Sequence, residues 1–416
     1  MKSLFSNWDK EQLYCASQGN ESNAVHFKSF YKLGSDEIKA RFPFSLFMKF
    51  VNKSGIIKGE ENNVNIHEKR YKSKSLKWVV YDKYLNPILK QLKVYHYRIK
   101  YSSSDNLNTW INEIKPDVIY AIVGNREECR LIEEVLENYD SAKVILHFLD
   151  DWMSSKHKET LFPKHYKTQT NKVLNRLFSY SHVNLSISKQ MSEEYARRYG
   201  YTFTPFHNPF DENTFNKVTK TNIIRKHKII TYLGRIDKDN IDVINDIIQA
   251  VNNLVSEGNK LHFNIYTNAN AKQSFVDMYI QKSENVNIYD FVPHDEIANL
   301  LINKSDILLL PNSFNKKSIE YVKYSISTKL TEYLASGTPV LTYAPNNIAI
   351  SEFCIENDCA TVLSERNIKL LKQTILNIME QNPDVTDKAK RGKELIFQNY
   401  TKESICRKFD SIITTF

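Results

Sequence analysis

Three residues, Gly234, Arg235 and Lys238, have the types and the spacing that a phosphate-binding turn requires. They stand in the stretch TYLGRIDKDN, where a β-branched and aromatic run ends at the glycine and a helical pattern follows. A glycine after a strand lets a ligand approach the backbone, and two cations beside a helix N-terminus suit a diphosphate. Two surface cations in an ordinary strand–helix turn would give the same pattern. The stretch predicts either a solvated turn or an anion site.

A second group of residues lies in the stretch STKLTEYLASGTPVL, which predicts a short helix followed by a buried strand. Ser327 or Thr328 can cap the start of this helix, and Gly337 suits a left-handed cap at its end. The free backbone N–H groups at Ser327, Thr328 and Lys329 can bind phosphate oxygens. Glu332 lies one turn further, off the apolar face, where its carboxylate could accept hydrogen bonds from a vicinal diol such as ribose. A solvated surface acid is the alternative interpretation.

The stretch HFLDDW holds three further candidates, because it ends a predicted strand and aims His147, Asp150 and Asp151 at the carboxyl edge of a sheet. One of the acids could orient or deprotonate a hydroxyl group. Two acids after a strand can also be a helix cap or ordinary loop residues, and His147 can be a hydrogen-bonded core histidine.

The elements that position these residues follow from the pattern of the whole chain. Short β-branched runs alternate with amphipathic helical stretches, which is typical of parallel sheets with helices on both faces. Strands are expected at 12–17, 25–33, 117–123, 143–149 and 183–188, and again at 228–234, 261–267, 285–292, 306–311 and 339–344. The polar, basic residues 216–227 separate the two series. We therefore predict an α/β fold of two Rossmann-like domains that face one another across a cleft, with ligands at the carboxyl ends of the strands.

The composition bounds the class of protein. With 416 residues, 41% hydrophobic and 25% charged, the chain can form two soluble domains, and no apolar run is long enough for a transmembrane helix. Its five scattered cysteines, without a CxxC pair, argue for reduced thiols in a cytoplasm. The net charge of +9 indicates an anionic partner. Because no nucleic-acid-binding motif accompanies this charge, we expect no nucleic acid among the partners.

Residues 153–182 carry six Lys or Arg against one Glu, interleaved with Phe162, Tyr166, Phe178 and Tyr180. A solvated basic helix that packs through its aromatic side chains would show this pattern. A patch for anionic lipid headgroups would show it too, and would place the protein peripherally at the inner face of a membrane.

The order of these motifs resembles the donor half of GT-B glycosyltransferases of the GT4 type (glycosyl transferases group 1), of the kind that builds bacterial surface polysaccharides. The resemblance rests on the strand–Gly–Arg–Lys turn and on FVPHDEIANLLINKSDILLLPNS and KYSISTKLTEYLASGTPVLTYAP, and it covers residues 205–365. In the first half, HFLDDW, SISKQMSEEYARRYG and HNPFD are similar to landmarks of the family.

The resemblance implies roles for individual residues. Glu332 matches the second acid of the E-x7-E motif of the family, which would bind the donor ribose, and Arg235 and Lys238 match the diphosphate-binding pair. Tyr324 stands eight residues before Glu332, where many members carry the first Glu, so this motif does not identify the donor sugar. Asp237 and Asp239 match the Asp-x-Asp pattern of metal-dependent sugar transferases. Because cations surround them, we interpret Asp239 as a helix cap and expect neither metal nor cofactor.

The implied activity is transfer of a sugar from a nucleotide-sugar to a glycan or lipid-linked acceptor, with retention of configuration and without a metal. The acceptor would bind residues 1–212 and the donor residues 213–385. Two alternatives share the architecture: a sugar-nucleotide epimerase, and a non-catalytic subunit that binds a partner transferase.

Two expectations concern the ends of the chain. The resemblance implies that a helix within residues 386–416 crosses back to the first domain. No apolar strand precedes Leu4, so we expect the first domain to lack its first strand, and either the stated start to be truncated or misassigned or acceptor binding to be defective.

Overall fold

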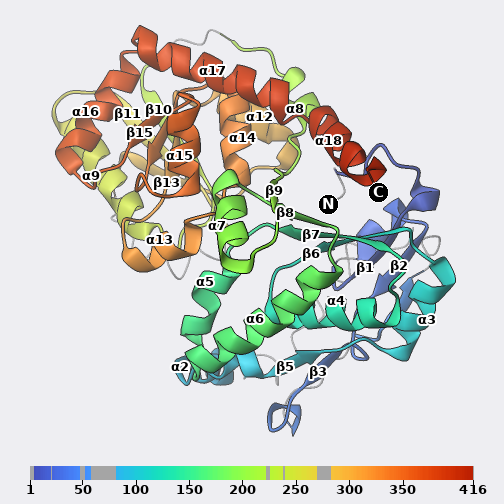
Figure 1. Ribbon diagram of the computed structural model, residues 1–416. Helices are drawn as coiled ribbons and strands as arrows, with labels where there is room; N and C mark the ends of the chain where they lie inside the picture. Colours follow the sequence, from blue (N-terminus) through green and yellow to red (C-terminus); the bar gives the residue numbers. More distant parts are fainter. Residues whose placement is uncertain are drawn as a thin grey trace. The chain divides into compact units, whose positions relative to one another are not determined.

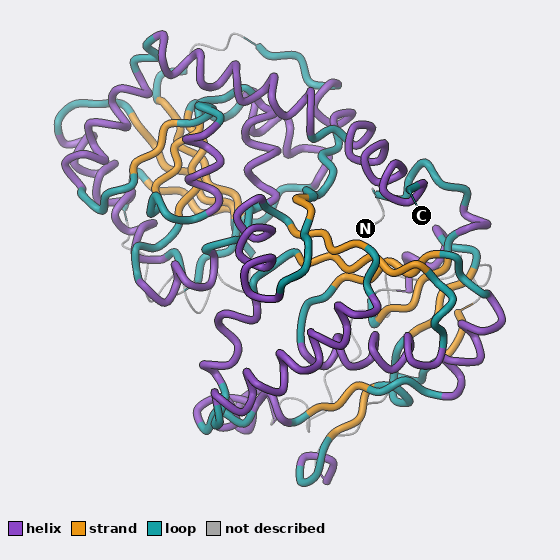
Figure 2. The backbone as a smooth tube through the Cα atoms, in the orientation of Figure 1, coloured by secondary structure: helices purple, strands orange, loops and turns teal. Residues whose placement is uncertain are grey.

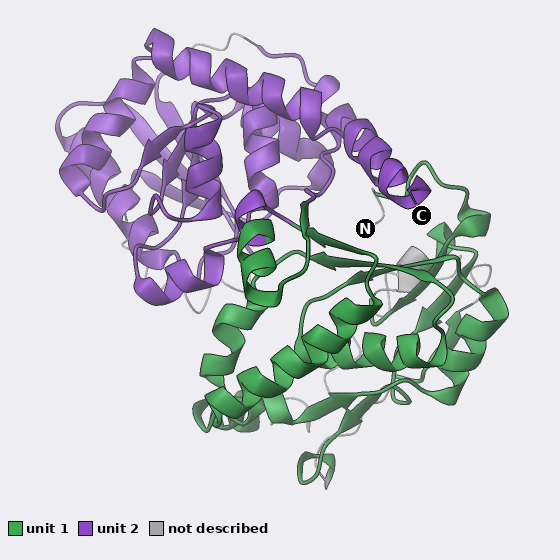
Figure 3. Cartoon of the chain, in the orientation of Figure 1, with its two compact units in different colours: residues 1–186, 192–204, 416 green, residues 187–191, 205–415 purple. Residues whose placement is uncertain are grey.

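The computed structural model describes residues 4–19, 21–46, 52–57, 81–221, 225–237, 239–268 and 283–415. They fold into two compact units, residues 1–186 with 192–204, and residues 187–191 with 205–415 (Figure 3). The sequence pattern also predicts a helix at 271–282 and an irregular insertion at 43–76. The helix and most of the insertion lie outside the described residues.

The second unit is built on a six-stranded parallel sheet in the order β12-β11-β10-β13-β14-β15 (Figure 1). Its strands are β10 (Lys228–Leu233), β11 (Leu261–Tyr266), β12 (Val286–Tyr289), β13 (Ile307–Pro311), β14 (Val340–Tyr343) and β15 (Thr361–Leu363). The chain order reverses between β10 and β13, which pair through Ile230 with Ile307 and Thr231 with Leu308. In doubly wound sheets this switch point is where the carboxyl ends of the strands leave room for a ligand.

Helices cover both faces of this sheet, and Figure 2 shows its strands enclosed by them. They are α8 (Glu212–Asn216), α9 (Ile241–Ser256), α12 (His294–Asn303), α13 (Lys316–Val322), α14 (Thr328–Ser336), α15 (Ala349–Glu356), α16 (Ile368–Met379), α17 (Pro383–Asn399) and α18 (Lys402–Thr414). Successive side chains of β13 point to opposite faces. Ile307 and Leu309 pack with α9 and α16, whereas Leu308 and Leu310 pack with α12, α14, α15 and α17.

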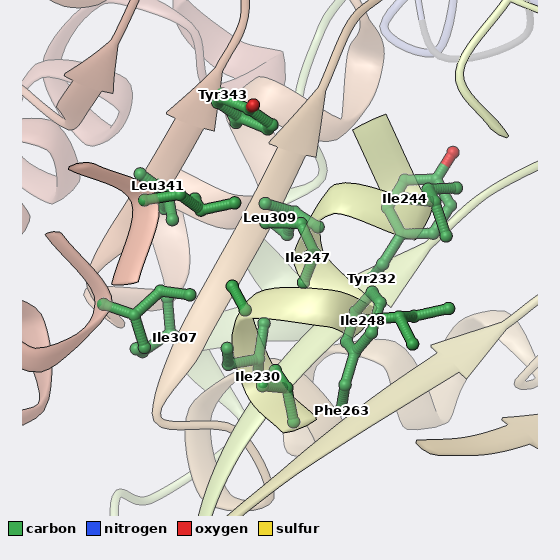
Figure 4. Packing of buried hydrophobic residues seen from close by; sticks show 14 of the residues in the cluster. Ile230, Tyr232, Ile244, Ile247, Ile248, Phe263, Ile307, Leu309, Leu341 and Tyr343 are labelled. Carbon is green, nitrogen blue, oxygen red and sulfur yellow. The ribbon is translucent and has the colours of Figure 1, made fainter. Parts of the chain in front are cut away.

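The face under α9 is a continuous apolar layer. Figure 4 shows its packing, with Ile230, Tyr232 and Phe263 of the sheet beside Ile244, Ile247 and Ile248 of α9. Full burial of each such side chain contributes about 1.5–3 kcal/mol to folding. This layer fixes β10, and therefore the turn that follows β10, at the centre of the unit.

The first unit contains three smaller sheets. Its strands are β1 (Tyr14–Ser17), β2 (Ser29–Lys32), β3 (Ile38–Ala40), β4 (Gly55–Ile57), β5 (Ile99–Tyr101), β6 (Val118–Ile122), β7 (Lys143–Phe148), β8 (Val183–Ser186) and β9 (Thr204–Pro205). The sheets have the orders β1-β2-β4, β3-β5 and β6-β7-β8-β9, and β6, β7 and β8 are parallel. Its helices are α2 (Asn86–Gln91), α3 (Asp105–Ile114), α4 (Arg126–Asn138), α5 (Trp152–Lys156), α6 (Pro163–Tyr180) and α7 (Lys189–Tyr199), whose first residues, 189–191, group with the second unit.

The predicted fold class is confirmed: the chain is an α/β protein with two parallel sheets, of four and six strands. The expected missing strand stays a prediction, and among the described strands β1 and β6 lie in separate sheets. Within the described ranges, no helix combines the length and the apolar character needed to cross a membrane.

The C-terminal segment forms two helices rather than one. Gly392 of α17 packs against α14, where a Cβ on this glycine would lie 2.8 Å from Leu334 Cδ2 and 3.0 Å from the Cys359 carbonyl oxygen. Ile396 is buried in the same layer. Residues 383–399 therefore pack within the second unit, and a crossing of α18 to the first unit stays a prediction.

We expect Gly392→Ala to lower the free energy of unfolding, although alanine favours an exposed helix by about 1 kcal/mol over glycine. The added methyl overpacks the contact with α14, which typically costs about 1–3 kcal/mol. Urea unfolding measures the effect. The matched control is Lys390→Ala, an exposed position of the same helix, which should change stability by less than about 0.5 kcal/mol. A stabilised Gly392→Ala variant would contradict the close packing.

Candidate functional site

The site begins where β10 ends. Gly234 is buried, and its amide donates a hydrogen bond to the Tyr266 carbonyl oxygen at 2.9 Å. A Cβ at this position would lie 2.6 Å from the Tyr232 hydroxyl and would collide with Lys329 Nζ. A side chain here would displace the Lys329 ammonium group and press on the buried Tyr232 ring. The predicted glycine turn and the predicted helix start are thus in contact.

The side chain of Asn240 holds the turn after Gly234 in place. Its Nδ2 donates to the Tyr232 hydroxyl at 3.0 Å and to the Arg235 carbonyl oxygen at 2.8 Å, and its Oδ1 accepts from the Asp237 amide at 3.0 Å. The Tyr232 hydroxyl in turn donates to the Arg235 carbonyl at 2.7 Å. These bonds hold the backbone of Arg235 in place. The residue is exposed to solvent. Lys238 lies outside the described residues.

The interpretation of Asp239 as a helix cap is wrong. Helix α9 starts at Ile241, and Asn240 is its N-cap residue. The Asp239 carboxylate accepts a hydrogen bond from Ser318 Oγ of α13 at 3.0 Å, and Asp237 Oδ1 accepts from the Asp239 amide. Asp239 is therefore directed to α13, because the helix begins one residue later than the sequence pattern indicates.

Helix α14 has the start and the end that the sequence predicts. Ser327 is its N-cap and accepts from the Lys329 amide at 3.3 Å, and Gly337 ends it with φ of 67°. Thr328, the first helical residue, is exposed. The Tyr333 hydroxyl accepts a hydrogen bond from the Leu233 amide at 2.9 Å, which ties the helix to the end of β10.

Lys329 is a half-buried cation at the start of a helix, where the helix dipole disfavours positive charge. Its Nζ lies 5.1 Å from the ring centroid of Tyr232. Burial lowers the pKa of Lys329 to about 8, and Arg235 adds to this shift, whereas Glu332 and Asp237 oppose it. No carboxylate of a described residue lies within ion-pair distance of Lys329. Lys329 thus lacks an ion-pair partner among the described residues, although Glu332 and Asp237 lie near enough to act on its charge.

Glu332 stands one turn inside α14 and is half-buried. Burial raises the pKa of this carboxyl, while His294 and Lys329 counteract the shift. Its carboxylate accepts no hydrogen bond from a described residue. His294 is the exposed first residue of α12. The Glu332 carboxylate is therefore available to a ligand that binds beside Lys329.

Tyr324 follows α13 and is half-buried. Lys323 Nζ lies 5.1 Å from its ring centroid, and its carbonyl oxygen accepts from Ser188 Oγ at 2.6 Å. Ser188 also caps α7 by accepting from the Met191 amide at 3.0 Å. The backbone at Tyr324 is thus fixed independently of α14.

The three candidates of the first unit have different surroundings. His147 is buried in β7, and its Nδ1 lies 2.6 Å from the Tyr120 hydroxyl. Asp150 is exposed just after the strand. Asp151 is buried and binds Arg198 at 3.1 and 3.2 Å, the Tyr195 hydroxyl at 3.0 Å and Ser154. These contacts occupy both oxygens of Asp151, so its environment is that of a structural ion pair.

The structure therefore brings Gly234, Arg235, Lys329 and Glu332 together at the carboxyl end of β10. Sequence reasoning missed the residues that hold this group: Tyr232, Asn240, Tyr333 and His294. The only signal for Asn240 was its place before an apolar helix, where asparagine is a frequent cap. In the part of the chain that the structure describes, no three His, Cys, Asp or Glu side chains converge as a metal site would need.

Residues 227–381 match a family model described as "Glycosyl transferases group 1". The chain is similar in structure to sucrose-phosphate synthase from Thermosynechococcus elongatus, with 12% identity, a TM-score of 0.57, and coverage of 75% of this chain and 76% of that chain. Anabaena HepE in complex with UDP and glucose has 12% identity, a TM-score of 0.54 and coverage of 74% and 81%. A glycosyltransferase from Rickettsia africae has 12% identity, a TM-score of 0.52 and coverage of 74% and 78%.

At these identities the solved structures establish a common fold. No curated protein sequence matches the chain.

We expect Lys329→Met to raise the melting temperature at neutral pH, because it removes a charge that burial disfavours. The pKa of Lys329 is about 8 in the folded chain and 10.5 in the unfolded chain. Between these values the unfolded chain binds more protons, so wild-type stability rises with pH. The advantage of the variant is therefore full below about pH 8 and shrinks as the pH rises toward 10.5.

Differential scanning fluorimetry across this pH range measures the effect. The matched control is Lys369→Met, because Lys369 is also the second residue of a helix with a capped amide, but is exposed. Equal responses of the two variants at every pH would show that Lys329 is not destabilised by burial.

Proposed function

We propose that the protein moves a sugar from a nucleotide-sugar to a hydroxyl group of a glycan or lipid-linked acceptor, because residues 227–381 match the family model of glycosyl transferases group 1. The observation that carries this proposal is the half-buried Lys329, held over Gly234 beside Arg235 without a described carboxylate partner. An anion bound at these cations would offset the cost of burying the charge of Lys329.

The diphosphate of the donor is the anion that we assign to these cations. Its oxygens would contact Lys329 Nζ, the Arg235 guanidinium and the free N–H groups at the start of α14. Gly234 leaves room for the Lys329 ammonium group against the backbone, as a larger residue would not, and so keeps this cation at the assigned diphosphate position. Lys238, which lies outside the described residues, is included only through the sequence resemblance.

The ribose of the donor would bind Glu332. A carboxylate accepts hydrogen bonds from both hydroxyls of a vicinal diol, and Glu332 lies one helical turn from the assigned diphosphate position. The HepE structure, which has the same fold and contains UDP and glucose, supports a nucleoside diphosphate in this role. UDP-glucose is therefore the first donor to test.

The proposed reaction breaks the bond between the anomeric carbon and the diphosphate oxygen, which leaves with the electron pair. The acceptor oxygen forms the new bond and gives up its proton. Charge that develops on the leaving diphosphate would be stabilised by Lys329 and Arg235, so we propose that no metal is needed. We further propose retention of configuration. For the acceptor side, His147 and Asp150 stay proposals as the residue that orients or deprotonates the hydroxyl group. The ion pair with Arg198 argues against this role for Asp151.

We expect Glu332→Gln to weaken UDP binding about ten- to hundredfold, because a charge-assisted hydrogen bond is worth about 1.5–3 kcal/mol. Isothermal titration calorimetry measures the dissociation constant. The matched control is Glu352→Gln, a half-buried glutamate near the start of α15, which should leave UDP binding unchanged. An unaltered dissociation constant for Glu332→Gln would remove Glu332 from the donor site.

We expect transfer activity to survive EDTA and to fall with rising salt, because the cations that neutralise the diphosphate are screened by ions. Arg235→Ala should reduce both transfer and the salt dependence of donor binding. Arg407→Ala, an exposed arginine of α18, serves as the control. Activity that disappears in EDTA and returns with Mn²⁺ would instead favour a metal held by Asp237 and Asp239.

A further inference from the structure

The first unit exposes apolar side chains in an unusual place, on the outer side of α2 and at the start of α6. Tyr84, Ile88 and Leu92 follow one another at helical spacing, and they are 58%, 50% and 56% exposed. A stripe at this spacing normally faces the core of a protein. In α2 only Leu89 faces inward. The outward stripe therefore lacks a partner among the described residues.

A second exposed pair lies beside this stripe. Leu161 and Phe162, which directly precede α6, are 49% and 61% exposed. The Leu161 amide donates to the Lys93 carbonyl oxygen at 2.9 Å, so this pair and the end of the α2 stripe are neighbours. Figure 1 shows α2 beside the start of α6. We call these five residues, Tyr84, Ile88, Leu92, Leu161 and Phe162, the apolar patch.

The choice of residue at Phe162 supports a role for the patch outside the fold. Phe162 is the N-cap residue of α6 and makes no side-chain cap hydrogen bond. Ser, Thr, Asp or Asn at an N-cap would typically stabilise the helix, whereas an exposed phenylalanine stabilises neither the helix nor the core.

The rim of the patch is strongly basic. Residues 81–100 and 152–172 contain ten Lys or Arg against Asp82 and Glu159. Exposed lysines at 83, 90, 93, 158, 164 and 167 stand within a few residues of the apolar side chains. Glu159 lies 3.2 Å from His96 and 4.0 Å from Lys156, so Lys156 offsets part of its negative charge.

Of the two interpretations of residues 153–182, the buried aromatic side chains agree with a basic helix that packs through its aromatic face. Tyr166 and Phe178 are buried in the first unit, because α6 packs through its aromatic face. Helix α6 as a whole is therefore an ordinary covering helix, and only its start belongs to the patch.

We propose that the apolar patch and its lysines dock the first unit on a bilayer that contains anionic lipids. The apolar side chains would enter the interface while the lysines contact lipid phosphates, which is the arrangement of membrane-surface segments. Charge complementarity selects the bilayer over an uncharged apolar partner. The proposal does not depend on sugar transfer, although docking would bring a lipid-linked acceptor within reach.

Co-sedimentation of the full chain with vesicles tests this proposal. We expect binding to vesicles of phosphatidylcholine with phosphatidylglycerol, weaker binding at high salt, and little binding to phosphatidylcholine alone. Leu92→Ser with Phe162→Ser should weaken binding about tenfold or more, because both exposed apolar anchors are lost. Lys90→Glu with Lys164→Glu should weaken it on anionic vesicles only.

The matched control is Ile355→Ser with Leu370→Ser, two exposed apolar residues of the second unit at 53% and 40% exposure, which should bind as the wild type does. UDP binding by calorimetry should stay unchanged in all variants, which shows that they fold and separates this proposal from the proposed function. Wild-type chain that stays in the supernatant, or equal binding by the Leu92/Phe162 variant, would overturn the proposal. A dimer that this variant loses, without vesicle binding, would assign the patch to a second copy of the chain.

Discussion

The hydrogen bond from the Leu233 amide to the Tyr333 hydroxyl is the interaction on which the candidate donor site depends. Strand β10 pairs with β13 only at Ile230 and Thr231, so its last amide on that side has no strand partner to bind. A tyrosine of α14 fills this position, and a buried amide must find such a partner. The same contact sets the depth of α14 against β10, and so brings Lys329 over Gly234.

That contact also places Lys329 where it has no ion-pair partner among the described residues. The two cations at Arg235 and Lys329 lie close enough to lower the pKa of the lysine together with burial. The acids nearby are used elsewhere or remain partly exposed: Asp239 is bound to Ser318, and Glu332 is available to a ligand. Sites that bind anions tightly often contain cations without an ion-pair partner. Such cations destabilise the empty protein, and the bound anion stabilises them. The turn keeps its shape through the neutral contacts of Tyr232 and Asn240 instead.

Much of the second unit could be predicted from the sequence, because local signals agree there: β-branched runs end at Gly234, and Ser327 and Gly337 bound α14. Most of the residues that assemble the site could not. Helical periodicity assigns Tyr333 to the apolar face, and only packing shows that its hydroxyl reaches an amide of another element. Asp151 has the pattern of a cleft acid, but it pairs with Arg198, 47 residues away. The cap of α9 was misplaced by one residue, because Asp239 and Asn240 are both good caps.

The order of strands has a consequence for synthesis on the ribosome. Strand β10 is an inner strand of the sheet, but its neighbour β13 and the tyrosine that completes its edge come much later in the chain; Leu233 and Tyr333 are 100 residues apart. A nascent chain that has released β10, β11 and β12 therefore still carries the open edge of β10, and must keep it from pairing with other chains. The edge closes only after α14 has emerged. The glycine turn and its cations are thus assembled late in translation, well after the first unit is available to fold.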